Sequence, residues 1–235
     1  MRESTIEALI LKHQPMGDAG LLVTVFSKEQ GKMRLLVKGA QRMTSKLAAA
    51  VQPGGSSFLT YTGKGNLPLV IHAKQEVFYL NDVTDLPIIS CWYVIAEWLL
   101  KTTVDEQPQP AVFILTDQAL SLLSSVDTAR VVLWWKLHLL NLLGWGIQVM
   151  TSAPGDIYFN FSDGSFVDAG RKSGDALRVS RQMVDLFEML DTTEANQLHN
   201  LVCVSDALTQ LDMLTTRYLT TIIERDLKAD RFRQL

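Results

Sequence analysis

The chain has 235 residues, of which 47% are hydrophobic and 20% charged, and its formal net charge is -3. This is the composition of an ordinary globular protein with room for one large domain or two smaller ones. Only two cysteines are present, too few for a disulfide framework. No leader-like segment or uninterrupted apolar run of roughly 20 residues occurs, so we expect an unexported cytoplasmic protein without a membrane span.

The two parts of the chain differ in charge and in periodicity. Residues 1 to 82 carry ten Lys and Arg against six Asp and Glu, whereas residues 83 to 235 carry twelve against nineteen. Apolar residues come first in short β-branched and aromatic runs, and then in long leucine-rich segments. The stretch NDVTDLP supplies turn formers and a proline where the pattern changes. We therefore predict an α+β protein with one domain over residues 1–82 and a mainly helical domain over residues 83–235.

Five strands are predicted in the first domain. They are ESTIEALILKH, LLVTVFS, KMRLLVK, SSFLTYTG and LVIHAKQEVFYL. The first three form a meander, and the last two form a hairpin across GKGNLP. Between the third and fourth strands, Thr44 or Ser45 can cap a short helix that the alanines favour and that Pro53 ends. This order predicts a five-stranded OB-fold barrel.

Cations gather in and around the third strand. Because side chains alternate along a strand, Met33, Leu35 and Val37 are expected to point into the barrel, and Lys32, Arg34 and Lys38 outward. Two interpretations remain open: lysines at a sheet edge that prevent association with other sheets, or a groove that binds phosphates. In the second case the candidate nucleic-acid-binding residues are Lys28, Lys32, Arg34, Lys38, Arg42, Lys46 and Lys64.

The first 80 residues also carry a family resemblance. A Gly-Asp turn after the first strand, a Glu-x-Gly-Lys turn after the second, and the stretch VKGA with the basic Arg42 two residues after it resemble the N-terminal domain of the RecO family of bacterial recombination mediators. The segment GKGNLPLVIHAKQEVF is similar to that family's last barrel strand. Later in the chain, WWKLHLLNLLGW resembles a helix of its helical domain, and DLKADRF resembles its closing segment.

The resemblance implies a non-catalytic function in DNA repair and recombination. The barrel is expected to bind single-stranded DNA, and the helical domain to engage protein partners. By resemblance those partners are single-strand-binding protein and RecR. The implied task is to anneal complementary strands and to help load the RecA recombinase on coated DNA, in the nucleoid-associated cytoplasm.

The chain departs from the family at two places. Many members carry two CxxC pairs that bind zinc, but the equivalent stretch GIQVMTSAPGDIYFNFSDGSFVDAG has no cysteine or histidine. We expect no metal or cofactor there, and instead a small hairpin near residues 157–168. The family also places an arginine, linked to capture of the acidic tail of single-strand-binding protein, where this chain has Trp134. Arg130 and Lys136 are the candidates to replace it, and the sequence leaves the choice open.

Other candidate chemistry is weak. The four histidines are dispersed, Cys91 and Cys203 are isolated, and no nucleophile lies beside a base, so we predict no catalytic residue and no enzyme activity. Phe26, Phe58 and Tyr61 fit either a core or a surface that stacks on bases. The alternative function is a protein–protein adaptor that keeps the fold without binding DNA directly. No feature supports the third alternative, an enzyme in the helical half.

Overall fold

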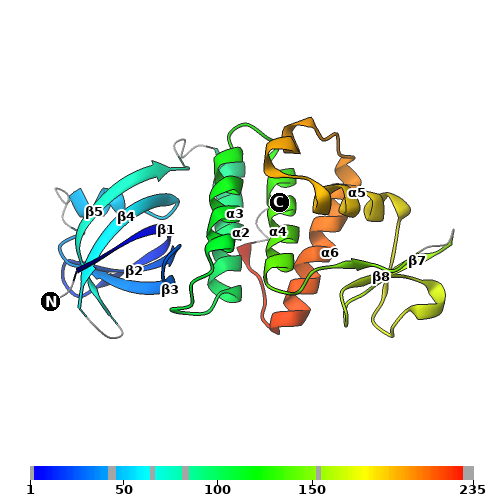
Figure 1. Ribbon diagram of the computed structural model, residues 1–235, viewed down its shortest axis with the longest axis horizontal. Helices are drawn as coiled ribbons and strands as arrows, with labels where there is room; N and C mark the ends of the chain where they lie inside the picture. Colours follow the sequence, from blue (N-terminus) through cyan, green and yellow to red (C-terminus); the bar gives the residue numbers. More distant parts are fainter. Residues whose placement is uncertain (1–2, 42–45, 64–66, 81–84, 152–154, 230–235) are drawn as a thin grey trace. The chain divides into compact units, whose positions relative to one another are not determined.

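A computed structural model describes residues 3–41, 46–63, 67–80, 85–151 and 155–229 of the chain. It divides into two compact units, Met1–Ile114 and Leu115–Leu235. Figure 1 colours the chain from blue at the N-terminus to red at the C-terminus. Among the described residues, no helix combines the length and the hydrophobicity that a bilayer crossing requires.

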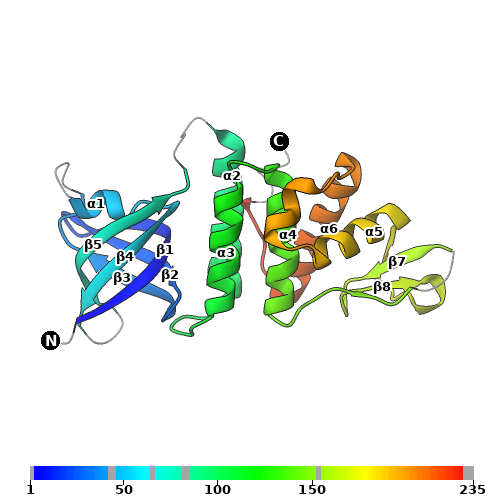
Figure 2. The same cartoon turned by 45° about the horizontal axis from the view of Figure 1, so that its top comes forward.

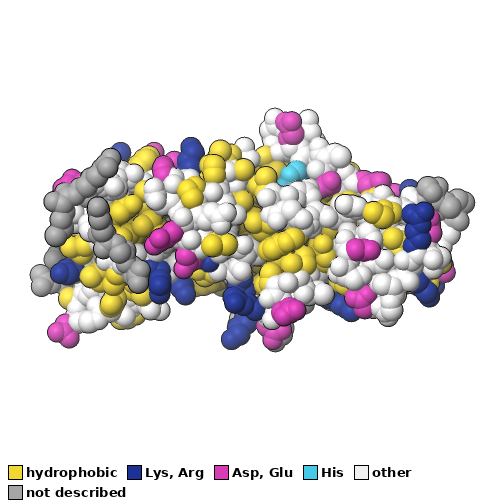
Figure 3. Space-filling model, turned by 60° about the horizontal axis from the view of Figure 1, so that its bottom comes forward, with side chains coloured by type: hydrophobic (Ala, Val, Ile, Leu, Met, Phe, Trp, Pro, Cys, Tyr) yellow, Lys and Arg dark blue, Asp and Glu magenta, His cyan; other side chains and the backbone are white. Residues whose placement is uncertain are grey.

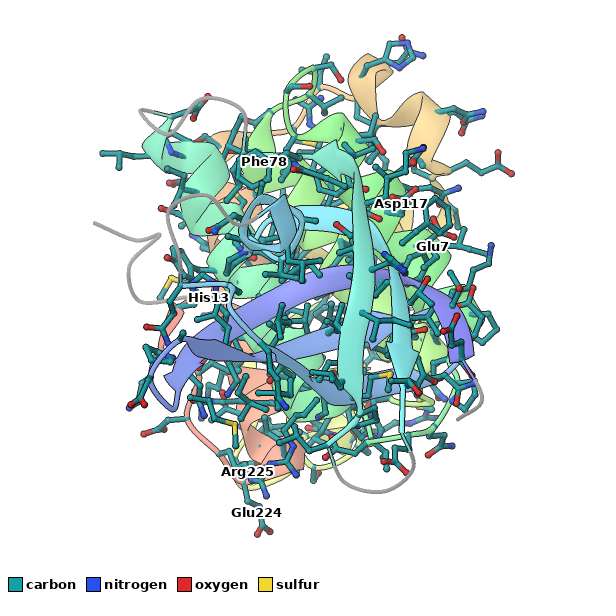
Figure 4. All side chains as sticks on the ribbon, turned by 90° about the vertical axis from the view of Figure 1, so that its left-hand side faces the viewer. Glu7, His13, Phe78, Asp117, Glu224 and Arg225 are labelled. Carbon is teal, nitrogen blue, oxygen red and sulfur yellow. The ribbon has the colours of Figure 1, made fainter. Side chains whose placement is uncertain are left out.

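The first unit is built on a closed five-stranded barrel. Its strands are β1 (Glu3–Met16), β2 (Gly20–Ser27), β3 (Gly31–Val37), β4 (Gly55–Thr62) and β5 (Leu69–Phe78). They follow the order β1-β2-β3-β5-β4, and β1 closes the barrel by pairing with β4. The predicted OB-type barrel is therefore confirmed. In Figure 4, Glu7 and His13 mark the course of β1 across the barrel.

Alternation along β3 places its apolar side chains as predicted. Met33, Leu35 and Val37 belong to the barrel core, with Val23 and Val25 of the neighbouring strand β2. Leu59 and Val70 line the same core from β4 and β5. The pairing register of β1 with β2 shifts at Leu11, which lies between Ile10 and Lys12, so that strand bends there.

A short helix, α1 (Lys46–Ala50), follows β3 as predicted and packs against β4 and β5 (Figure 2). The hydroxyl of Ser57 donates a 2.6 Å hydrogen bond to the Ala50 carbonyl, which ties α1 to β4. The caps proposed for α1, Thr44 and Ser45, lie outside the described residues.

Helix α2 (Leu86–Thr102) completes the first unit with the start of α3 (Pro110–Leu122). The side chain of Asp85 caps α2 by accepting a 3.2 Å hydrogen bond from the Ile88 amide. α2 packs against β1, and Phe113 at the start of α3 contacts Phe26 of β2 with ring centroids 6.3 Å apart. α2 and the start of α3 therefore belong to the outer cover of the barrel.

The second unit contains the rest of α3 and the helices α4 (Thr128–Leu142), α5 (Arg181–Thr192) and α6 (Ser205–Ile223). α4, α5 and α6 pack against one another in pairs. Asp127 caps α4 by accepting a 2.9 Å bond from the Arg130 amide, and Ser180 caps α5 through the Met183 amide. Short 3-10 turns lie at Ala169–Arg171 and Ala195–Asn200.

A small sheet accompanies these helices. The predicted hairpin is present as β7 (Ile157–Asn160) and β8 (Ser165–Asp168). The sequence missed two further strands, β6 (Gln148–Val149) and β9 (Leu177–Val179), which extend the hairpin to the order β6-β8-β7-β9. Both are too short to show a period-two pattern. Phe159 packs edge-on against Phe166 and Tyr218, which joins the sheet to α6.

Candidate nucleic-acid interface

A row of polar side chains crosses the outside of the barrel over three strands. Thr24 of β2 pairs with Lys12 on one side and with Arg34 on the other, so all three point away from the core. Lys12 and Arg34 are exposed, whereas Thr24 between them is 6% exposed. Sequence reasoning missed Lys12, because the irregularity at Leu11 interrupts the simple alternation along β1. The row gives the outer face two exposed cations on strands that flank β2.

Lys32 also points away from the core, but it is not exposed as predicted. Its side chain is only 12% exposed and its ammonium donates to the carbonyls of Leu100 and Thr103, at 2.8 and 2.6 Å. Asp105 lies 3.4 Å away. These carbonyls belong to the end of α2, where a cation is favoured because the helix dipole is negative there. Lys32 therefore fastens β3 to α2, and we exclude it from the phosphate contacts.

The structure describes only some of the remaining predicted cations of the barrel. Lys38 is exposed in the turn after β3, and Lys28 is half-buried in the turn between β2 and β3. Arg42 and Lys64 lie outside the described residues, and for Lys46 only the helical backbone is described. Figure 3 shows that cations and carboxylates are interspersed on the face that it presents.

The three aromatic side chains left open by the sequence have different environments. Phe26 is fully buried between β2 and Phe113, and Tyr61 packs against the barrel core. Phe58 is 39% exposed on the outside of β4, where the strand register places it between Glu7 and Lys74. Among these three, Phe58 is the most exposed.

Comparisons with known proteins agree with this architecture. The family model described as Recombination protein O N terminal matches residues 1–75, and the one described as Recombination protein O C terminal matches residues 83–231. The chain belongs to the RecO family. RecO proteins are proteins of DNA repair and recombination.

Individual relatives are similar at moderate identity. DNA repair protein RecO of Photobacterium profundum is 29% identical over 152 residues, 64% of each chain. The protein of the same name from Desulfitobacterium hafniense is 31% identical over 148 residues, which cover 63% of this chain and 54% of the relative. That from Acidithiobacillus ferrooxidans is 32% identical over 139 residues, 59% of this chain and 53% of the relative. The matched region spans between 53% and 64% of the length of these relatives, less than two thirds in each case.

In the helical part of this RecO protein, the two cations predicted to bind a partner are both engaged inside the unit. Lys136 is fully buried, and its ammonium lies 3.0 Å from the Asp212 carboxylate and 2.9 Å from the Thr216 hydroxyl. The expectation that Lys136 reaches a partner's tail therefore needs correction. Arg130 is half-buried, and its Nη1 donates a 3.0 Å bond to the Leu198 carbonyl.

Trp134, at the position where the resemblance implied an arginine, is itself buried. Its indole Nε1 donates a 2.8 Å bond to the Thr193 carbonyl, and its ring lies 4.7 Å from that of His138. Both side chains line a hollow of about 390 Å³ that Leu115, Gln118 and residues 192–196 complete. Among the described residues, the lining contains Glu194 but no lysine or arginine. This hollow is therefore poorly suited to a negatively charged group.

No metal site is formed within the part of the chain that the structure describes, where no three His, Cys, Asp or Glu side chains gather in a way that could hold an ion. Cys91 is buried and Cys203 is half-buried. Burial raises the pKa of the Cys203 thiol above its ordinary value, although Arg130 beside it acts in the opposite direction. Burial also raises the pKa of the Tyr218 phenol, and the nearby Asp163 carboxylate adds to that effect. Both groups are thus held in their neutral forms at pH 7.

Proposed function

We propose that this RecO protein is a non-catalytic recombination mediator that binds single-stranded DNA on the outer face of its barrel. The observation that carries the proposal is the strand register that brings Lys12 and Arg34 to either side of Thr24. Lys38 follows at the end of β3 and is exposed. Cations on such a face attract phosphates whatever the base sequence, as in proteins that bind single strands without sequence preference.

Partner exchange is the rest of the proposal. From the family we infer that the protein anneals complementary strands and helps load RecA on DNA coated with single-strand-binding protein, together with RecR. These steps transfer DNA between proteins and need no covalent chemistry. We also propose that the protein works in the cytoplasm at the nucleoid, where its DNA substrate lies.

The salt dependence of DNA binding tests the proposed interface. With Lys12, Arg34 and Lys38 on phosphates, the log-log slope of affinity against salt should be about -2, at about -0.7 per contact. The double substitution Arg34→Ala with Lys38→Ala should weaken binding for every sequence and flatten the slope by about 1.4. Fluorescence anisotropy of a labelled oligonucleotide measures both effects.

A matched control separates local contact from net charge. Arg178 and Arg181 are exposed cations of the second unit, and each is paired with a carboxylate on the surface. Changing both to alanine alters the net charge equally and should leave the slope unchanged. If the two double variants weaken binding to the same extent, or if neither does, the barrel face is not the DNA site. The second result would favour a protein adaptor that retains the fold.

A further inference from the structure

A groove lies between the second half of α5 and strand β6 in the second unit. Its volume is about 620 Å³, and Ile147, Val149 and Phe187 supply apolar lining. Two more apolar side chains of the adjoining segments are unusually exposed, Leu142 at 47% and Met150 at 46%. Exposed apolar side chains near a groove of this size are typical of interaction sites.

Among the residues that the structure describes, the charged side chains that line the groove are acidic. Glu188 and Asp191 of α5 line it together with the apolar side chains. They lie in the last turns of the helix, where the carbonyl ends of the backbone already make the field negative. The last turn of α5 contains no basic residue that would offset this field. Asp191 accepts a 2.6 Å bond from the Asn141 amide, whereas within the described residues no cation lies within 4.0 Å of the Glu188 carboxylate.

The Glu188 carboxylate lies in an unfavourable place on its helix. A carboxylate at the C-terminus of a helix is typically destabilising, because it meets the negative end of the helix dipole. The nearby Asp185, by contrast, is paired with Arg181 one turn earlier on the same helix. A positive group from outside the chain would offset the field at Glu188, and an adjoining apolar side chain would fill the groove.

We propose that this groove binds a partner protein through a segment that carries a lysine or arginine next to an apolar residue. The apolar side chain lies over Val149 and Phe187, and the cation approaches Glu188. The charge of the groove excludes an acidic tail as the occupant. The groove is separate from the hollow beside Trp134, since the two have only Thr192 in common.

A charge reversal tests the proposal. The probe is a fluorescein-labelled hexapeptide of alternating lysine and leucine, and its glutamate–leucine counterpart serves as the opposite charge. Full-length protein should bind the lysine peptide more tightly than the glutamate peptide. Glu188→Lys should weaken binding of the lysine peptide about threefold to fivefold, since exposed charge pairs contribute up to about 1 kcal/mol, and should strengthen binding of the glutamate peptide. Fluorescence anisotropy at low salt reports both affinities.

Asp185→Lys is the matched control, because it makes the same charge change on the same helix outside the groove lining. It should leave the preference for the lysine peptide in place. Equal effects of the two substitutions would overturn the proposal and indicate attraction by net charge alone. Unchanged binding of both peptides by Glu188→Lys would also overturn it. Sedimentation velocity gives the last outcome: if Glu188→Lys converts a dimer to a monomer, the groove is instead an interface between copies of this chain.

Discussion

Gly164, in the turn between β7 and β8, is required for two separate reasons. Its φ of +66° lies in the left-handed region that other residues rarely adopt. In addition, a Cβ at this position would collide with the hydroxyl group of Tyr218 on α6. Gly144 after α4 has a similar φ of +79°, but no atom lies within 4 Å of the place where its Cβ would be. A substitution at Gly144 therefore introduces backbone strain alone, whereas one at Gly164 introduces both backbone strain and a steric clash.

We predict that Gly164→Ala destabilises the protein more than Gly144→Ala does. The left-handed conformation alone costs about 1–2 kcal/mol, and this cost is common to both substitutions. Gly164→Ala must also displace the Tyr218 ring from its packing against Phe159, which adds to the loss of stability. Urea unfolding of the two variants measures the difference. Equal losses would mean that Tyr218 moves without cost.

At the scale of the elements, β3 presents two cations with different roles. Lys32 bonds the end of α2, whereas Arg34, two residues later on the same outer face, is exposed. Lys32→Met should lower the free energy of unfolding by about 1–3 kcal/mol, because two helix-end carbonyls lose their charged donor, and should leave DNA binding nearly unchanged. Arg34→Met should weaken DNA binding and leave the free energy of unfolding nearly unchanged. Urea unfolding and oligonucleotide anisotropy are measured on both variants. If Lys32→Met loses DNA binding and Arg34→Met does not, the roles given to the two residues are wrong.

The contrast between these residues shows what the sequence could predict. Alternation along KMRLLVK gave the correct direction of every side chain in β3, because the period of a strand is local. It could not reveal that Lys32 is covered, since its partners Leu100 and Thr103 come about seventy residues later in the chain. Lys12 was missed because the irregularity at Leu11 interrupts the alternation along β1, and its place near Arg34 depends on the pairing of β1, β2 and β3.

The helices of the second unit contain a buried ion pair that joins α4 to α6. Lys136 is fully buried and Asp212 is 7% exposed. Lys136→Met should cost about 3–5 kcal/mol, because it leaves the Asp212 carboxylate buried without its cation. The double substitution Lys136→Met with Asp212→Leu should recover much of that loss, since both charges are then absent. Chemical denaturation of the three proteins provides the comparison, and a double variant as unstable as the single one would refute the argument.

At the scale of the whole molecule, the barrel could be predicted in detail from the sequence, whereas the packing of α2 could not. Strand periodicity and turn residues gave all five barrel strands, whereas the change in composition near residue 82 says nothing of which unit α2 packs against. In the structure α2 and the start of α3 belong to the same compact unit as the barrel. The domain boundary at residues 82 and 83 stays a prediction, and it coincides with the gap between the two matched family models.

Two fragments test how far the barrel depends on the helices that follow it. Leu9 and Phe26 point outward from the barrel core and are nevertheless 0% exposed. A fragment of residues 1–114 keeps α2 and Phe113, whereas a fragment of residues 1–82 leaves this outer surface in water. Burial of a large apolar side chain typically contributes about 1.5–3 kcal/mol. With two such side chains uncovered, the shorter fragment should be less stable than the longer one by about 3–6 kcal/mol. It should also lose the bonds that Lys32 makes to α2. Urea unfolding followed by circular dichroism measures the difference. Equal stability of the two fragments would show that the barrel folds without the helices and that the predicted boundary is a true domain limit.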